Sequence, residues 1–245
     1  MFSIHHSGSN AILLRFKQEI SSSVHSQVLS LEVRLKQAFE SGKLCGIEEL
    51  VSAYASLLIY FDPLLLNIKD LFEFLEDAKK NLQVKDQASR LCLELPCCYD
   101  EEFGLDLDFV CRHCKLSKKE LVALHSEVYY LVYMLGFMAG FAYLGGLDKR
   151  LFTPRLKEPR AKIQAGSIGI ADRQTGIYPI SSPAGWQIIA KTPLKLFDKT
   201  KKDPTLLKPS MLVKFKPIDR LEFKHIEEEI KSGVYKERIY EYKGD

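Results

Sequence analysis

The segment from Val128 to Pro193 constrains the fold most strongly, because it combines short β-rich runs with closely spaced glycines. Gly136, Gly140 and the pair Gly145-Gly146 interrupt an aromatic stretch, and turn residues recur at about ten-residue intervals further along. This rhythm favours a closed or nearly closed β-barrel. Such a density of glycines and aromatic side chains also indicates a functional site, although the segment contains no metal-ligand, nucleophile or phosphate-binding motif.

The region before this segment follows a different pattern. Strand-like runs at 2–6 and 11–16 flank a Ser-Gly-Ser-Asn turn, which predicts a hairpin. Apolar residues at helical spacing predict one helix over 23–40 and another from Ile68 to Leu82, the second with Asn67 as its N-cap. One strand around Leu57 to Phe61 lies between them. This order predicts a small α+β sandwich, with helices on one side of an antiparallel sheet.

A polar run from Lys85 to Ser89 separates the two regions, and a length of 245 residues suggests two domains. We therefore expect an N-terminal domain at 1–86 and a second domain at 87–245. A strand at 90–99 and helices at 106–114 and 117–126 should follow the boundary. Ser117 and Glu120 have the spacing of a capping box. Everything after Val128 is expected to be strand and turn.

Composition narrows the functional classes. The chain is 46% hydrophobic and 27% charged, as in a globular protein, and its formal net charge of +3 gives no indication of nucleic-acid binding. No secretory signal precedes the first strand, which predicts a cytoplasmic protein with reduced cysteines. Cys97-Cys98 and the pair Cys111 and Cys114 do not have the spacing of a structural zinc site, so we expect no metal centre.

The stretch from Val128 to Leu147 has no charged residue over a length close to that of a membrane span. Its Gly145-Gly146 pair, clustered tyrosines and β-branched residues are more typical of a buried strand that leads into a loop. We therefore predict strands here and no membrane insertion.

Three blocks of sequence resemble a known family. They are GFMAGFAYLGGL at 136–147, TPR at 153–155 and AGSIGIADRQTGIYPISSPAGWQIIAKTPLKLFD at 165–198. The chain is similar there to the KipI/PxpB family, also called allophanate hydrolase subunit 1. It departs from the usual family residues at four positions: Ala139 for Pro, Asp172 for Gly, Ala184 for Gly and Lys191 for Arg. Three of these changes replace a Pro, which fixes φ, or a Gly, which permits positive φ, so they affect loop shape more than the fold.

The resemblance implies a fold, an activity and partners. Family members carry a small ferredoxin-like α+β domain followed by a cyclophilin-like β-barrel. The implied role is that of the B-type subunit in an ATP-dependent 5-oxoprolinase, which opens 5-oxo-L-proline to L-glutamate together with an A-type subunit and a KipA-type (C-type) subunit. ATP, with magnesium, would be bound by the complex. Two alternatives stay open: inhibition of a sensor histidine kinase, and a carboxyltransferase-like domain acting on urea-type amides.

Candidate site residues come from the same segment and the helix before it. His125 is the candidate catalytic residue, although a histidine at a helix C-terminus also simply complements the helix dipole. Arg155 suits a carboxylate through its fork-shaped guanidinium, and a Gln-Thr-Gly turn offers an amide, a hydroxyl and free backbone to a lactam. Aromatic residues nearby either contact a ligand or pack in the core. The expected substrate-binding residues are Phe141, Tyr143, Arg155, Gln174, Thr175, Gly176 and Tyr178.

Overall fold

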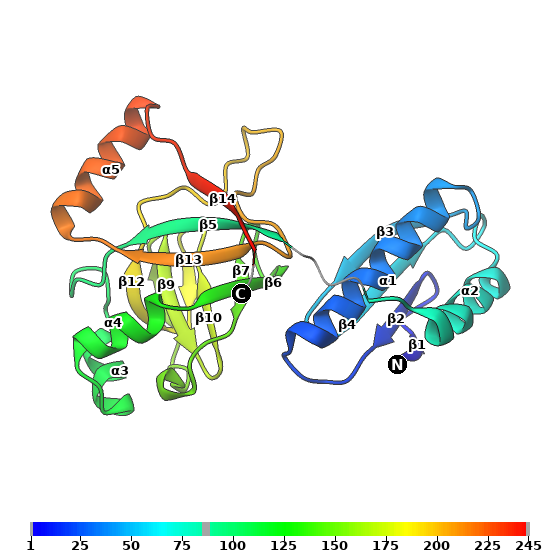
Figure 1. The fold of residues 1–245 in the computed structure, drawn as a ribbon, viewed down its shortest axis with the longest axis horizontal. Helices are drawn as coiled ribbons and strands as arrows, with labels where there is room; N and C mark the ends of the chain where they lie inside the picture. Colours follow the sequence, from blue (N-terminus) through cyan, green and yellow to red (C-terminus); the bar gives the residue numbers. More distant parts are fainter. Residues whose placement is uncertain (1, 85–88, 244–245) are drawn as a thin grey trace. The chain divides into compact units, whose positions relative to one another are not determined.

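The computed structural model of the protein describes residues 2–84 and 89–243. The chain divides into two compact units, residues 1–87 and 88–245 (Figure 1). Each unit has its own hydrophobic core. The predicted boundary, Lys85 to Ser89, lies outside the described residues except for Ser89. The fold is a mixture of helices and several sheets, and the finer ferredoxin-like and cyclophilin-like descriptions stay predictions.

The first unit is a four-stranded antiparallel sheet with two helices. Its strands lie in the order β1 (Ser3–His6), β2 (Ala11–Arg15), β4 (Ser56–Phe61) and β3 (Ile47–Ser52). Helix α1 (Ser22–Glu40) packs against β3 and β4, and α2 (Ile68–Asn81) begins at the predicted N-cap Asn67. The prediction of one strand between the helices was wrong, because a short turn divides that stretch into β3 and β4.

The second unit is built on an eight-stranded sheet. Its neighbouring strands are antiparallel except for β13 and β5, which run parallel. In spatial order the strands are β12 (Gln187–Lys191), β9 (Ser167–Ala171), β10 (Gln174–Ile177), β7 (Ala142–Gly145), β6 (Tyr129–Leu135), β13 (Leu212–Pro217), β5 (Arg90–Cys97) and β14 (Arg238–Tyr242).

The barrel, which was predicted to be closed or nearly closed, is not closed. Within the described residues the edge strands β12 and β14 do not pair with each other, so the sheet is open. One isolated β-bridge joins the residue after β5 to the end of β12, because Cys98 and Lys191 exchange two backbone hydrogen bonds of 2.8 and 3.1 Å. A second, two-stranded sheet joins β8 (Arg160–Ile163) to β11 (Ser182–Ala184). The large sheet therefore has the strand rhythm of a barrel but keeps free edges.

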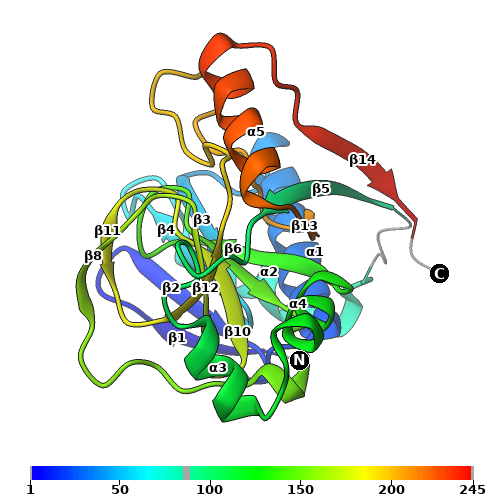
Figure 2. The ribbon, with the colours of Figure 1, turned by 90° about the vertical axis from the view of Figure 1, so that its left-hand side faces the viewer.

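Helices cover the sheet of the second unit. Helix α3 (Leu107–Cys114) and helix α4 (Lys118–Ser126) follow the prediction, and α4 has the expected capping box. Helix α5 (Arg220–Ser232) was not predicted, and a short 3-10 helix, η1, spans Lys149–Leu151. In both views α5 lies on the opposite side of β5 and β13 from α3 and α4 (Figures 1 and 2).

The uncharged stretch from Val128 to Leu147 forms the antiparallel strands β6 and β7, as predicted. No helix in the described part of the chain is long and apolar enough to cross a membrane. The predicted turn at 174–176 was misplaced. Those residues form β10, and the reversal from β9 occurs at Asp172 and Arg173, where Asp172 adopts a left-handed φ of 53°.

Candidate functional site

Strand alternation divides the predicted site residues between two faces of the sheet. On β10, Thr175 packs inward, and Gly176 faces the opposite side, because successive side chains of a strand point in opposite directions. Gly176 is paired with Tyr143 on β7, so the glycine-rich segment at 136–147 and β10 are neighbours. The predicted residues therefore form an inner group around His125 and an outer group around Phe141.

The inner group is a chain of hydrogen bonds through a fully buried histidine. His125 Nδ1 lies 2.6 Å from the Tyr99 hydroxyl, and His125 Nε2 lies 3.0 Å from Thr175 Oγ1. Thr175 Oγ1 also donates to the Gly169 carbonyl at 3.0 Å. Because the Thr175 hydroxyl donates its proton to the Gly169 carbonyl, its oxygen can only accept from His125. We therefore assign the histidine proton to Nε2, which donates to Thr175, while Nδ1 accepts from the Tyr99 hydroxyl.

This arrangement holds His125 in its neutral form. Burial lowers the pKa of His125 to about 3, because a charged imidazolium would lose its hydration in the core. The ring lies against Phe215 and Tyr130, with centroid separations of 4.4 and 5.4 Å. Both ring nitrogens are used by protein groups. The geometry gives His125 a positioning role toward Tyr99 and Thr175, and its catalytic role stays a prediction.

The outer group is an aromatic cluster formed by Phe141, Tyr143, Tyr178 and Trp186. Phe141 lies at its centre, 4.8 to 5.5 Å from the ring centroids of the other three. These edge-to-face geometries are favourable for aromatic pairs. Burial raises the pKa of the Tyr178 hydroxyl to about 12, so it stays protonated and can donate a hydrogen bond. Trp186, the single tryptophan of the chain, completes this cluster.

Gly176 is required by this packing. A Cβ atom at position 176 would lie 2.9 Å from Trp186 Cζ3 and 3.0 Å from Phe141 Cζ. Those distances are shorter than carbon atoms tolerate, and both neighbours belong to rigid rings. Gly176 therefore contributes space for the rings rather than the free backbone that the sequence suggested.

Arg155 lies at the rim of the aromatic cluster. Its guanidinium carbon is 5.9 Å from the Trp186 ring centroid, and its Nε is 3.4 Å from the Asp172 carboxylate. Both ion-pair partners are exposed, so the pair is weak and a ligand carboxylate can replace Asp172. Gln174, the first residue of β10, is partly exposed. This rim combines an aromatic face, a cation and an amide, which suits a small organic acid. By contrast, Arg160 is held in a bidentate ion pair with Asp106.

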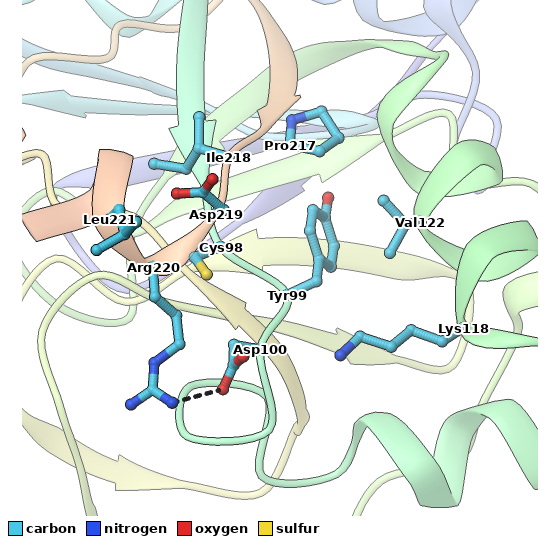
Figure 3. Close-up of a pocket in the computed structure, with 10 residues that line it drawn as sticks. All are labelled: Cys98, Tyr99, Asp100, Lys118, Val122, Pro217, Ile218, Asp219, Arg220 and Leu221. Carbon is cyan, nitrogen blue, oxygen red and sulfur yellow. Dashed lines mark ion pairs between the residues drawn. The ribbon is translucent and has the colours of Figure 1, made fainter.

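A hollow of about 460 Å³ lies beside Tyr99, between the loop after β5, the start of α5 and helix α4 (Figure 3). Arg220 forms ion pairs with Asp100, at 3.8 Å, and with Glu102. Lys118 extends toward the hollow from α4 (Figure 3). The lining residues are Cys98, Tyr99, Asp100, Lys118, Val122, Pro217, Ile218, Asp219, Arg220 and Leu221.

Sequence reasoning missed this hollow. Its residues come from segments more than a hundred positions apart, Cys98 to Asp100 and Pro217 to Leu221. The parallel pairing of β5 with β13 brings their ends together. A local signal existed only for α5, where Asp219 caps the helix and Gly233 ends it. The hollow places a phenol, two cations and carboxylates around one space, and the Tyr99 hydroxyl connects it to the His125 chain.

The cysteines do not form a metal site in the described part of the chain, where no three histidine, cysteine, aspartate or glutamate side chains are placed to hold an ion. Burial raises the pKa of the Cys97 thiol to about 12, so Cys97 is not a thiolate at neutral pH. Cys111 and Cys114 are free thiols on α3.

Comparisons of sequence identify relatives of the chain. The family model of the carboxyltransferase domain, subdomain C and D, matches residues 2–207. A protein of Bacillus subtilis (strain 168) named as the B-type subunit of 5-oxoprolinase is 37% identical over 238 residues, covering 93% of this chain and 98% of the relative. The similarity therefore extends over both units of the structure.

Comparisons of structure agree. The crystal structure of TTHA0988 superposes with a TM-score of 0.74 at 32% identity, covering 85% of this chain and 40% of that chain. The Kluyveromyces lactis urea amidolyase has a TM-score of 0.81 at 21% identity, covering 98% of this chain but 16% of the larger protein. The second similarity is one of fold. In both cases the chain corresponds to less than half of the matched protein.

Proposed function

The chain belongs to the family of the carboxyltransferase domain, subdomain C and D, in its KipI/PxpB branch, and we propose that it acts as the B-type subunit of an ATP-dependent 5-oxoprolinase complex. The observation that carries this proposal is the end-to-end similarity to a protein named as that subunit. The proposed reaction opens 5-oxo-L-proline to L-glutamate, together with an A-type subunit and a KipA-type (C-type) subunit.

ATP supplies the free energy for opening the lactam in this proposal. Among the described residues, no three or more His, Cys, Asp or Glu side chains are grouped so that they could hold a metal ion by themselves. Gly166-Ser167-Ile168-Gly169 also lacks the Lys-Ser/Thr pair of a phosphate-binding loop. We propose that the complex binds Mg-ATP, with contacts shared between subunits, and that this chain contributes substrate recognition.

The rim of the aromatic cluster suits the substrate. 5-Oxoproline carries one carboxylate and one lactam, and a lactam needs one hydrogen-bond donor and one acceptor. Arg155 would bind the carboxylate in place of Asp172, and the Gln174 amide would bind the lactam. Tyr143 and Trp186 would cover the apolar edge of the ring. Since Arg155 is already at the surface, this exchange requires no change in the core.

The test is reconstitution of the complex. The chain is co-expressed and purified with homologues of the A-type and KipA-type subunits, and ADP release and glutamate formation are measured with and without 5-oxoproline. We expect both products only with 5-oxoproline and all three proteins. An assembled complex without turnover would contradict the proposal and shift attention to kinase inhibition, which stays a prediction.

Arg155→Ala is the specific test of the rim. Loss of a charge-assisted hydrogen bond costs about 1–3 kcal/mol, so we expect the KM for 5-oxoproline to rise roughly 5- to 150-fold. Arg173→Ala is the matched control, because Arg173 is an exposed arginine next to Asp172 in the β9–β10 turn, and it lies over Phe152 rather than Trp186. Equal effects of the two substitutions would remove Arg155 from substrate binding.

A carboxyltransferase-like activity on urea-type amides is the second candidate. The family model and the similarity of fold to urea amidolyase favour it. Replacing 5-oxoproline by urea or allophanate in the reconstituted assay distinguishes the two candidates.

A further inference from the structure

A second hollow of about 450 Å³ lies in the same unit, and it shares no lining residue with the His125 chain or with the four rings of the aromatic cluster. Five segments contribute to it: the loop after β5, the end of β8, the start of β9, the loop before β11 and the end of β12. The lining residues are Glu102, Phe103, Leu105, Lys162, Ile163, Gln164, Ser167, Ser181 and Lys191. Its volume is in the range of small-molecule sites.

Lys191 is held in place at this hollow. Its ammonium donates to Gln164 Oε1 at 2.6 Å and lies 5.4 and 5.6 Å from the ring centroids of Phe103 and Phe223. None of these partners is an anion. The Lys191 ammonium is therefore held in position but has no negatively charged group beside it in the described part of the chain. Gln164 accepts through its oxygen, which leaves its amide N–H groups to donate elsewhere.

The remaining polar groups also leave room for an anion. Ser167 is 5% exposed and lies directly opposite Lys191 in the β9–β12 pair, so its hydroxyl lines the hollow beside the Lys191 side chain. Lys162 makes no ion pair within the residues described. The one carboxylate in the lining, Glu102, is already paired with Arg220. The hollow thus combines the oriented ammonium of Lys191, the exposed Lys162 and the Ser167 hydroxyl, and its one carboxylate is already paired outside it.

We propose that this hollow binds the oxyanion of a small organic molecule, a carboxylate or a phosphate group. Lys191, Lys162 and Ser167 donate to the oxyanion, and Phe103, Leu105 and Ile163 cover the apolar part of the ligand. Charge-assisted hydrogen bonds of this kind are stronger beside apolar walls than in open water. The inference is independent of the proposed function, because it uses none of the residues that would bind 5-oxoproline.

The test is a titration of the full chain, followed by amide chemical shifts, with inorganic phosphate and with benzoate at constant ionic strength. We expect saturable shifts at Gln164, Ser167 and Lys191. Lys191→Met should weaken binding about tenfold, the effect of losing one such bond, and Lys191→Arg should restore most of it. Saturation by phosphate alone identifies a phosphate ligand, and saturation by benzoate alone identifies a carboxylate.

Two further lysine variants test whether the loss of binding is specific to lysines that line the hollow. Lys157→Met removes an exposed lysine that does not line the hollow, and it should leave the affinity unchanged. If Lys191→Met fails to fold, Lys162→Met tests the same point at an exposed position. The proposal is overturned if neither probe saturates, or if Lys157→Met weakens binding as much as Lys162→Met.

Discussion

Gly176 shows how one missing side chain shapes the aromatic cluster. Gly176→Ala places a Cβ atom against Trp186 and Phe141, and we expect this overpacking to lower the free energy of unfolding by roughly 1–3 kcal/mol. Gly136→Ala is the control, since its Cβ would meet only the flexible end of Met134 at 3.3 Å. Urea unfolding measures both variants. Equal stabilities would show that the rings move aside freely.

His125 gives stability a pH dependence. Its pKa falls from the ordinary 6.5 to about 3 on folding, so below pH 6.5 the unfolded chain binds a proton that the folded chain excludes. Stability from this residue is therefore complete above pH 6.5 and declines as the pH falls toward 3. Between pH 7.5 and 5.5 the loss should be about 1.4 kcal/mol.

The variant His125→Gln isolates this contribution, because glutamine does not titrate. Urea unfolding at pH 7.5 and 5.5 should show a smaller pH effect in the variant than in the wild type. His225→Gln, at an exposed position on α5, should keep the wild-type pH dependence. A His125→Gln variant with the full wild-type pH effect would contradict the assignment of a neutral, buried imidazole.

At the scale of elements, Asp106 connects helix α3 with the strands β8 and β12. Its carboxylate accepts two bonds from Arg160 on β8, at 2.5 and 2.9 Å, and one from the Ile188 N–H on β12, at 2.7 Å, while its backbone stands at the N-cap position of α3. Arg160→Met leaves a largely buried carboxylate without its cation. We expect a loss of roughly 1–3 kcal/mol in unfolding free energy.

The exposed pair of Arg155 and Asp172 is the matched comparison for Arg160→Met. Arg155→Met should cost less than about 1 kcal/mol, because solvent screens this pair. Thermal or urea unfolding of both variants measures the difference. If Arg155→Met is as destabilising as Arg160→Met, burial is not what distinguishes the two pairs.

Elements with local signals were predictable. Asn67 and Ser117 cap α2 and α4 as expected, since capping involves only neighbouring residues. Helix α5 was missed although Asp219 and Gly233 bound it, because the strand rhythm before it was extended too far. The hairpin reversal was placed at Gln174 instead of Asp172 because both segments are rich in turn-forming residues.

At the scale of the whole molecule, two separate cores predict two independently stable units. No residue is shared between the clusters centred on Leu31 and on Val213. Insertion of a protease recognition sequence between Lys85 and Ala88, followed by cleavage, should yield two fragments that each keep cooperative unfolding. A fragment that loses its near-UV circular dichroism on cleavage would show that the units depend on each other.

The candidate site was only partly predictable at this scale. The sequence indicated that β7 and β10 carry site residues, and they are neighbours. It could not reveal that Thr175, the partner of His125, faces away from the aromatic cluster that Gly176 contacts, because strand register decides which face a strand residue takes. The hollow beside Tyr99 could not be predicted from the sequence either, because it depends on the pairing of two strands, β5 and β13, that are far apart in the chain.

That pairing of β5 with β13 also sets the order of events during synthesis. β5 ends at Cys97, but its parallel partner begins at Leu212 and its other partner at Arg238, so β5 emerges from the ribosome long before either neighbour exists. The first unit can fold during translation, whereas the second must wait until β14 has been made. A growing chain is therefore expected to expose the unpaired edges of β5 until both neighbouring strands have been made.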